Sequence, residues 1–237
     1  ERPVNANKKD DLMKESQDYF AQARSALEKA EEGLDNILKD TKRFPTFIDQ
    51  KENPKLFEER EEVRRDFMQA KLMSALVVSE SAKAYPKDSE DAKKLLQTAS
   101  ERYEGIYERW RNRLAGLYAR MYQARCQQEL KNYKQALALY EEILVQPNED
   151  QAIRELQAKA LRLAMTCLLE PDENKYEEAI RRGEEAVKDQ RGVEGRTNEG
   201  LAVRWMLVQA YQAAEKAAKD DAAKKKILVD IKKHAKE

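Results

Sequence analysis

The chain of 237 residues is 38% charged and 41% hydrophobic, with only 7 glycines and 6 prolines. Its hydrophobic fraction is too high for a disordered chain, and much of it is alanine and leucine, which favour helices. The 45 basic and 45 acidic side chains give a formal net charge of zero, so the overall charge favours neither nucleic acid nor an anionic membrane as a partner. The composition predicts a well-solvated, all-helical protein.

The sequence contains no run of eighteen apolar residues, so we expect no membrane span. The chain begins at Glu1 without a methionine, and we expect an upstream segment to have been removed. The compartment stays open: the protein is expected to be soluble, and either cytoplasmic or exported after loss of a signal segment.

The two cysteines, Cys126 and Cys167, are too few for a disulfide framework or a zinc site. We expect two buried or half-buried thiols, with a bridge between them as the alternative. The one histidine, His234, lies among lysines near the C-terminus, where we expect the helix to fray. The sequence also has no glycine-rich phosphate loop and no metal-ligand spacing. We therefore predict no catalysis, no cofactor and no metal.

The N-terminal part shows three amphipathic helices in chain order. Apolar residues recur at intervals of three and four over residues 10–40. A second helix is predicted from Pro54, which suits a first turn, to Tyr85, before the break imposed by Pro86. Acidic and hydroxyl residues at 88–91 predict the N-terminus of a third helix. The sequence does not decide whether this third helix breaks near Arg111 or continues.

The C-terminal part is predicted to contain six further helices joined by short polar turns. A polar, glycine-containing connection at 191–198 precedes the last pair. The predicted helices are Leu114–Leu130, Tyr133–Val145, Ile153–Leu169, Lys175–Ala186, Gly200–Ala217 and Ala222–Ala235.

Two of these helices open with the same pattern. Tyr133 is followed three residues later by Ala136, and Tyr176 is followed three residues later by Ala179. A branched aliphatic residue comes directly after each alanine. The two alanines are 43 residues apart. Because a small side chain lets a neighbouring helix come close, we expect both alanines to face another helix.

Residues 133–147 resemble the second helix of a tetratricopeptide (TPR) repeat. Ala136 and Tyr140 stand four residues apart, and Pro147 closes the run. The separation of the two matching alanines is longer than the roughly 34 residues of that family. A third, partial match, to the first helix of a repeat, is carried by Trp205, Leu207, Ala210 and Tyr211.

The resemblance covers residues 113–237 and implies a fold of antiparallel helix pairs stacked as a TPR-like right-handed superhelix. Residues 1–112 are not matched and are predicted to be an N-terminal helical region, made of degenerate repeats or a helical cap. One helix pair cannot bury its apolar face alone, so we expect the pairs to stack in one continuous array. The alternative architecture is a helical bundle followed by TPR-like repeats.

The resemblance also implies a function, because the first helices of TPR repeats line a concave groove that holds a protein or peptide partner. Carried onto this chain, the groove positions are Tyr118, Met121, Arg125, Gln128, Trp205, Gln209 and Gln212. Arginine and large apolar side chains suit such contacts. A place in the helix–helix core is the alternative for each aromatic residue. We expect a non-catalytic scaffold or adaptor.

Arginines alternate with tyrosines and a tryptophan over residues 102–125. This mixture is typical of protein interfaces, of nucleic-acid contacts and of structural salt bridges. Two alternative functions follow from it: a structural subunit that self-associates through this segment, and a weak RNA-binding helical protein.

Overall fold

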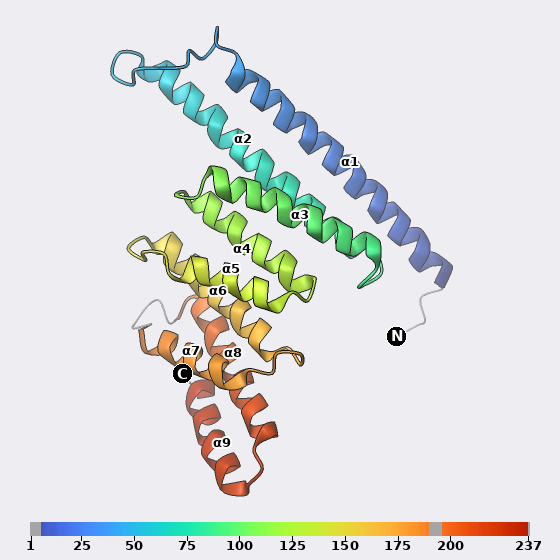
Figure 1. The fold of residues 1–237 in the computed structure, drawn as a ribbon, viewed down its shortest axis with the longest axis vertical. Coiled ribbons are helices and arrows are strands. Elements are labelled where there is room, and N and C mark those ends of the chain that lie inside the picture. The colour runs from blue at the N-terminus through green and yellow to red at the C-terminus, as the bar shows by residue number, and fades with distance from the viewer. Residues whose placement is uncertain (1–5, 190–195, 237) are drawn as a thin grey trace. The chain divides into compact units, whose positions relative to one another are not determined.

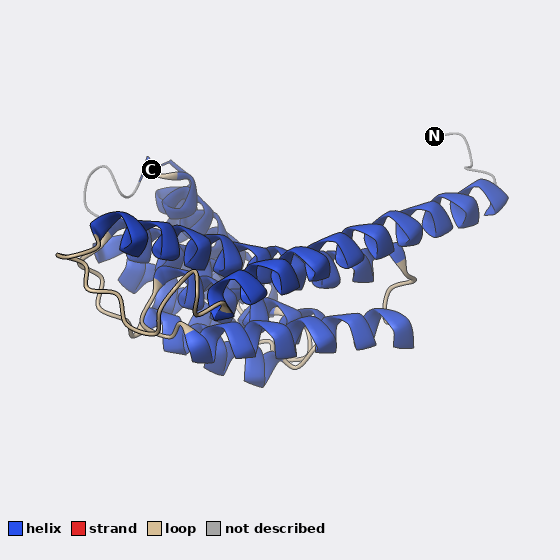
Figure 2. Cartoon of the chain, turned by 90° about the horizontal axis from the view of Figure 1, so that it is seen from above, coloured by secondary structure: helices blue, strands red, loops and turns tan. Residues whose placement is uncertain are grey.

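A computed structural model describes residues 6–189 and 196–236, and all regular secondary structure in these ranges is helical (Figures 1 and 2). The prediction of an all-α protein is confirmed. None of the described helices is long and apolar enough to cross a membrane. The chain divides into two compact units, residues 1–126 and 127–237.

From residue 6 onward, the first unit contains three complete helices, a short 3-10 turn and most of a fourth helix. Successive helices run in alternating directions, and α2 contacts both α1 and α3 (Figure 1). The elements are α1 (Ala6–Lys39), α2 (Pro54–Ser81), η1 (Ala82–Ala84), α3 (Glu90–Arg109) and α4 (Leu114–Glu129), whose last residues belong to the second unit.

The core of the first unit lies around α2 and α3. Phe67 and Val78 of α2 and Tyr103 of α3 are almost fully buried. Tyr103 also stacks on Tyr122 of α4, with the ring centroids 5.5 Å apart. By contrast, every side chain described in α1 keeps part of its surface exposed. This helix therefore covers the core from outside and contributes little to its interior.

The connection between α1 and α2 is held by two apolar anchors. Phe44 and Ile48 are buried, with 3% and 6% of their surface exposed. Phe47, which lies between them in the sequence, is 79% exposed and contributes nothing to this anchoring.

The third predicted helix ends at Arg109, which settles the question that the sequence left open. The following residue, Trp110, has φ −127° and ψ 35° and so leaves the helix. Gly116 then brings the first turn of α4 against this corner. A Cβ atom at Gly116 would lie 2.1 Å from the Trp110 carbonyl oxygen. The α3–α4 corner therefore requires glycine at this position for space.

Replacing Gly116 by alanine should lower the free energy of unfolding by about 1–3 kcal/mol, because backbone atoms would have to move apart. Gly105 is the matched control, since a Cβ atom there would meet nothing within 4 Å. Gly105→Ala should raise stability by about 0.5–1 kcal/mol through helix propensity. Urea unfolding followed by circular dichroism measures both effects, and equal stabilities for the two variants would contradict the packing described here.

The described residues of the second unit, 127–189 and 196–236, form five complete helices. The predicted polar connection before the last pair falls mostly on residues 190–195, which lie outside the described residues. Thr197 caps the helix that follows by accepting a hydrogen bond from the Gly200 amide. The helices are α5 (Tyr133–Leu144), α6 (Gln151–Leu169), α7 (Tyr176–Asp189), α8 (Asn198–Ala217) and α9 (Asp221–Lys236).

The helices of the second unit stack through small residues. Helix α6 contacts α5, α7 and α8, and α8 also contacts α7 and α9. Ala136 and Ala179 have no exposed surface, so the prediction that both face neighbouring helices is confirmed. One turn after Ala179, a Cβ atom at Gly183 would lie 2.9 Å from Met165 Cε and 3.0 Å from Leu207 Cδ1. The close approach of neighbouring helices to α7 thus depends on two small residues, Ala179 and Gly183. The sequence pattern indicated only Ala179.

The turns before the two matching helices each contain a residue with a positive φ angle. Lys131 has φ 65° and Asn174 has φ 46°, and each stands two residues before the tyrosine that opens the next helix. These left-handed residues reverse the chain after α4 and α6. The similarity of sequence at Ala136 and Ala179 is therefore accompanied by a similarity of the preceding turns.

Two expectations for titratable side chains meet different outcomes. His234 is 8% exposed and stacks on the Tyr211 ring at 5.8 Å, so the expected fraying at this position is wrong. Its ring is held by α8, a contact that short-range sequence patterns do not reveal. Cys126 and Cys167 are both free and buried, as expected for two thiols. Burial raises the pKa of the Cys167 thiol to about 12, so it stays protonated.

A charged network links α7 to α5. Glu178 accepts hydrogen bonds from Arg181 and Arg182, both at 2.7 Å, and Arg182 also donates to Glu141 at 2.9 Å. The bonds from Arg181, followed by those from Arg182, lower the pKa of Glu178 to about 2. The pKa of Glu178 is thus lower in the folded than in the unfolded state. Its bonds to the two arginines therefore stabilise the fold fully above the pKa of the unfolded state, and this stabilisation is lost as the pH falls toward 2.

The free energy of unfolding should therefore depend less on pH in a Glu178→Gln variant than in the wild type, between pH 4.5 and 2. At neutral pH the variant should lose about 1 kcal/mol or less, since the network is at the surface. Glu177→Gln, which removes an exposed carboxylate with no partner among the described residues, should retain the wild-type pH dependence. Urea titrations at a series of pH values make the comparison.

Candidate functional site: a charged cleft in the first unit

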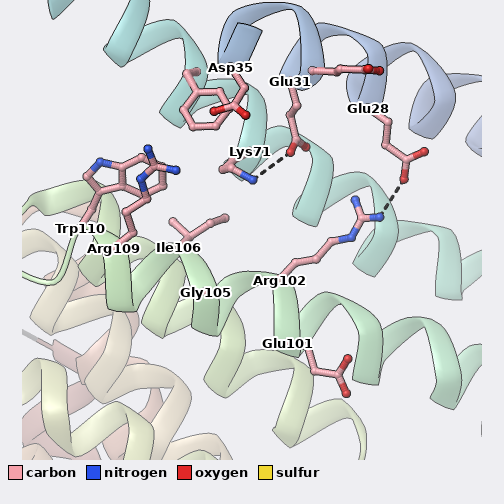
Figure 3. Close-up of a pocket in the computed structure, with 12 residues that line it drawn as sticks. Glu28, Glu31, Asp35, Lys71, Glu101, Arg102, Gly105, Ile106, Arg109 and Trp110 are labelled. Atoms are coloured by element: carbon pink, nitrogen blue, oxygen red, sulfur yellow. Dashed lines mark hydrogen bonds and ion pairs between the residues drawn. The ribbon is translucent and has the colours of Figure 1, made fainter. Parts of the chain in front are cut away.

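A cleft of about 640 Å³ lies among α1, α2 and α3 (Figure 3). One wall, from α1, carries four carboxylates, and the opposite side carries two arginines, a lysine and a tryptophan. The lining residues are Glu28, Glu31, Glu32, Asp35, Phe67, Lys71, Glu101, Arg102, Gly105, Ile106, Arg109 and Trp110.

Two ion pairs cross this cleft. Lys71 Nζ lies 3.2 Å from Glu31 Oε2, and Arg102 Nη2 lies 2.8 Å from Glu28 Oε1 (Figure 3). The other terminal nitrogen of Arg102 donates to the hydroxyl of Ser74 at 2.6 Å, and Ser74 is buried. Arg102 therefore ties α3 to both α1 and α2.

Arg109 occupies the other end of the cleft without an acidic partner. Its guanidinium lies 5.1 Å from the centre of the Phe67 ring and 5.0 Å from that of Trp110. These two rings meet edge to face, with centroids 6.2 Å apart. Arg109 forms no ion pair with any of the described residues. Its orientation is therefore set by aromatic contacts, which leave its hydrogen-bond donors available to a ligand.

The predicted groove residue Tyr118 lines a second, smaller depression in the first unit. The side chain is half-buried between α2 and α4, in an apolar groove of about 320 Å³. The two most exposed residues beside it are Met73, at 43%, and Leu114, at 38%. The groove is lined by Leu72, Met73, Leu76, Leu114, Ala115, Tyr118 and Tyr122.

The three other groove residues predicted on α4 differ in exposure. Met121 is only 1% exposed, so the prediction that it faces outward is wrong. It lies on the buried side of α4, and the helical register of the assumed repeat alignment misplaced it. Arg125 and Gln128 are half-buried. Gln128 accepts a hydrogen bond from the Tyr140 hydroxyl at 2.9 Å and so helps to join α4 to α5.

The groove residues predicted on α8, in the second unit, lie mostly toward solvent. Trp205 is 58% exposed, and Leu201, one turn earlier, is 48% exposed. Gln212 is exposed and Gln209 is half-buried. A place for Trp205 in the helix–helix core is therefore excluded. Leu201 was not predicted, although its spacing of four residues from Trp205 could have indicated it.

The arginines of the segment 102–125 are largely occupied within the protein. Arg111 and Arg120 stack on the ring of Tyr107 at 5.3 and 4.1 Å. Tyr103 and Tyr107 are 1% and 6% exposed and cannot stack on nucleic-acid bases. The alternation of arginine and aromatic residues thus has a structural use in this part of the chain.

Within the described residues, no group of three or more histidine, cysteine or acidic side chains could hold a metal ion. No protein-family model matches the sequence, and neither the curated proteins nor the solved structures contain a significant match. The function must therefore be argued from the chain's own surfaces.

Sequence reasoning missed the cleft because its acidic wall comes from α1, which the repeat pattern does not cover. A signal was present in the spacing. Glu28 and Asp35 are seven residues apart, as are Arg102 and Arg109. Such a spacing returns to the same helix face. This spacing predicts that the acidic residues of α1 face the arginines of α3 only if the two helices are known to be neighbours.

Replacing Arg102 by glutamine should lower the free energy of unfolding by about 1–3 kcal/mol, because both the ion pair to Glu28 and the hydrogen bond to buried Ser74 are lost. Arg111→Gln is the matched control. It removes only the stacking on Tyr107, worth about 0.5–1 kcal/mol at an exposed site. Chemical denaturation measures both, and an Arg102→Gln protein no less stable than the control would contradict the bridging role.

Proposed function

We propose that this protein is a non-catalytic scaffold or adaptor that binds a polypeptide partner on exposed faces of stacked helices. The observation that carries the proposal is the pair of large apolar side chains, Leu201 and Trp205, displayed on one face of α8. More than half of the Trp205 surface, 58%, is exposed to solvent on this helix. Tryptophan is also the residue type most enriched at the energetic centres of protein interfaces.

The helix contacts of the second unit support a TPR-like arrangement. In such repeats each first helix contacts its own partner helix and the first helix of the next repeat. Here α6 contacts both α7 and α8, and α8 contacts α9. The equivalent turns at Lys131 and Asn174 add a second, independent similarity between successive hairpins. Both observations favour stacked repeats over a simple bundle.

Nucleic-acid binding has less support than protein binding. The tyrosines that could stack on bases are buried at positions 103 and 107, and Arg102 is neutralised by Glu28. Self-association remains the main alternative, since exposed apolar faces also serve contacts between copies of one chain.

A Trp205→Ala variant should capture at least about tenfold less partner than the wild type, because the exposed indole supplies the contact area. The measurement is quantitative affinity purification from source-cell lysate with immobilised wild-type and variant proteins. Phe47→Ala is the matched control, since Phe47 is a 79% exposed aromatic residue in the α1–α2 connection. It should capture the same proteins as the wild type.

Circular dichroism should show equal helicity for all three proteins, because Trp205 is not part of the core. Equal capture by Trp205→Ala and wild type would reject α8 as the binding face. Self-association is tested separately by sedimentation velocity, where a shift from dimer to monomer in Trp205→Ala alone would favour the alternative.

A further inference from the structure

The charged cleft of the first unit has one incomplete pair of facing side chains. Glu28 of α1 pairs with Arg102 of α3. Seven residues further along each helix stand Asp35 and Arg109, which line the same cleft (Figure 3). Helices α1 and α3 run in the same direction because each is antiparallel to α2, so this second pair repeats the register of the first.

The second pair is not formed. Asp35 instead bonds Lys39, one turn along its own helix, at 2.5 Å. Arg109 is held by the Phe67 and Trp110 rings. The cleft is thus closed by an ion pair at Arg102 and open at Arg109, with opposite charges on its two walls.

The remaining charges define what can enter. Glu32 has no partner among the described residues, and Glu101 is bonded only to the neutral Gln97 side chain. On the other wall the guanidinium of Arg109 is fixed in orientation and forms no ion pair with the described residues. A purely acidic ligand would meet the carboxylates of α1, and a purely basic one would meet Arg109.

We infer that the cleft binds a polypeptide segment of mixed charge, whose acidic side chain bonds Arg109 and whose basic side chain bonds Glu32 and Asp35. The inference goes beyond the proposed function, since it assigns a second binding site, in the first unit, and names the chemistry of its ligand. Charges of both signs on facing walls select partners by complementarity and reject those of a single sign.

The dimensions of the cleft suit a peptide. Its acidic wall runs from Glu28 to Asp35, seven residues of helix, which is roughly 10 Å. With about 640 Å³ the cleft can hold several side chains. The half-buried Trp110 ring at its open end adds apolar contact beside Arg109, as in the central pockets of protein interfaces.

A larger side chain at Gly105 is expected to fill part of the cleft without disturbing the fold. Gly105 lies in its wall, and a Cβ atom there would meet no atom within 4 Å. A Gly105→Leu side chain would therefore extend into open space in the cleft. Leucine also favours the helix more than glycine does, so α3 should remain intact.

The experiment uses a phage-displayed library of random peptides of about twelve residues, selected on the full-length wild-type protein. Affinities of the enriched peptides are then measured by fluorescence anisotropy for wild type and variants. We expect enriched peptides to carry acidic and basic residues together. Gly105→Leu and Arg109→Gln should each weaken their binding at least about tenfold, whereas Arg111→Gln, an arginine outside the cleft, should not.

Three results would overturn the inference: no enriched peptide, enriched peptides with charges of one sign only, or unchanged binding to Gly105→Leu. Peptides that bind Gly105→Leu normally but lose affinity for Trp205→Ala would reject the cleft and still support the proposed scaffold function. Circular dichroism of Gly105→Leu confirms that the filled variant is folded.

Discussion

Close approach of helices at positions with little or no side chain is the constraint on which the packing of each unit depends. In the first unit Gly116 lets α4 begin directly against the Trp110 carbonyl. In the second unit, neighbouring helices come close at Ala136, Ala179 and Gly183. Any larger side chain would have to displace backbone or core atoms, and protein interiors have few voids to absorb such changes.

The helices themselves were predictable because the signals that define them are local. Pro54 begins α2 and Ser89 caps α3 with its side chain, as the sequence indicates. The buried alanines were predictable for the same reason, since their spacing within one helix is visible in the sequence. The break after Arg109 was not decided by the sequence, because it depends on the fit of Gly116 against a residue of the preceding corner.

The candidate sites were less predictable because they combine distant segments. The sequence left Trp205 open between a groove and the core, and it is exposed, whereas Met121 was assigned to the groove from an assumed repeat register and is buried. The cleft brings together Glu31 of α1 and Lys71 of α2, which are 40 residues apart. His234 was likewise misjudged from its position near the chain end, where contact with Tyr211 orders it.

Helix α1 has 34 residues, yet none of its described side chains is fully buried. Because its side chains are only partly buried, we expect it to open at a lower free energy than the helices around Tyr103. Because α1 carries the whole acidic wall of the cleft, the site exists only while this helix is docked. A ligand that bridges α1 and α3 would stabilise the docked state of α1. Amide hydrogen exchange along α1 would then become slower when the ligand is bound.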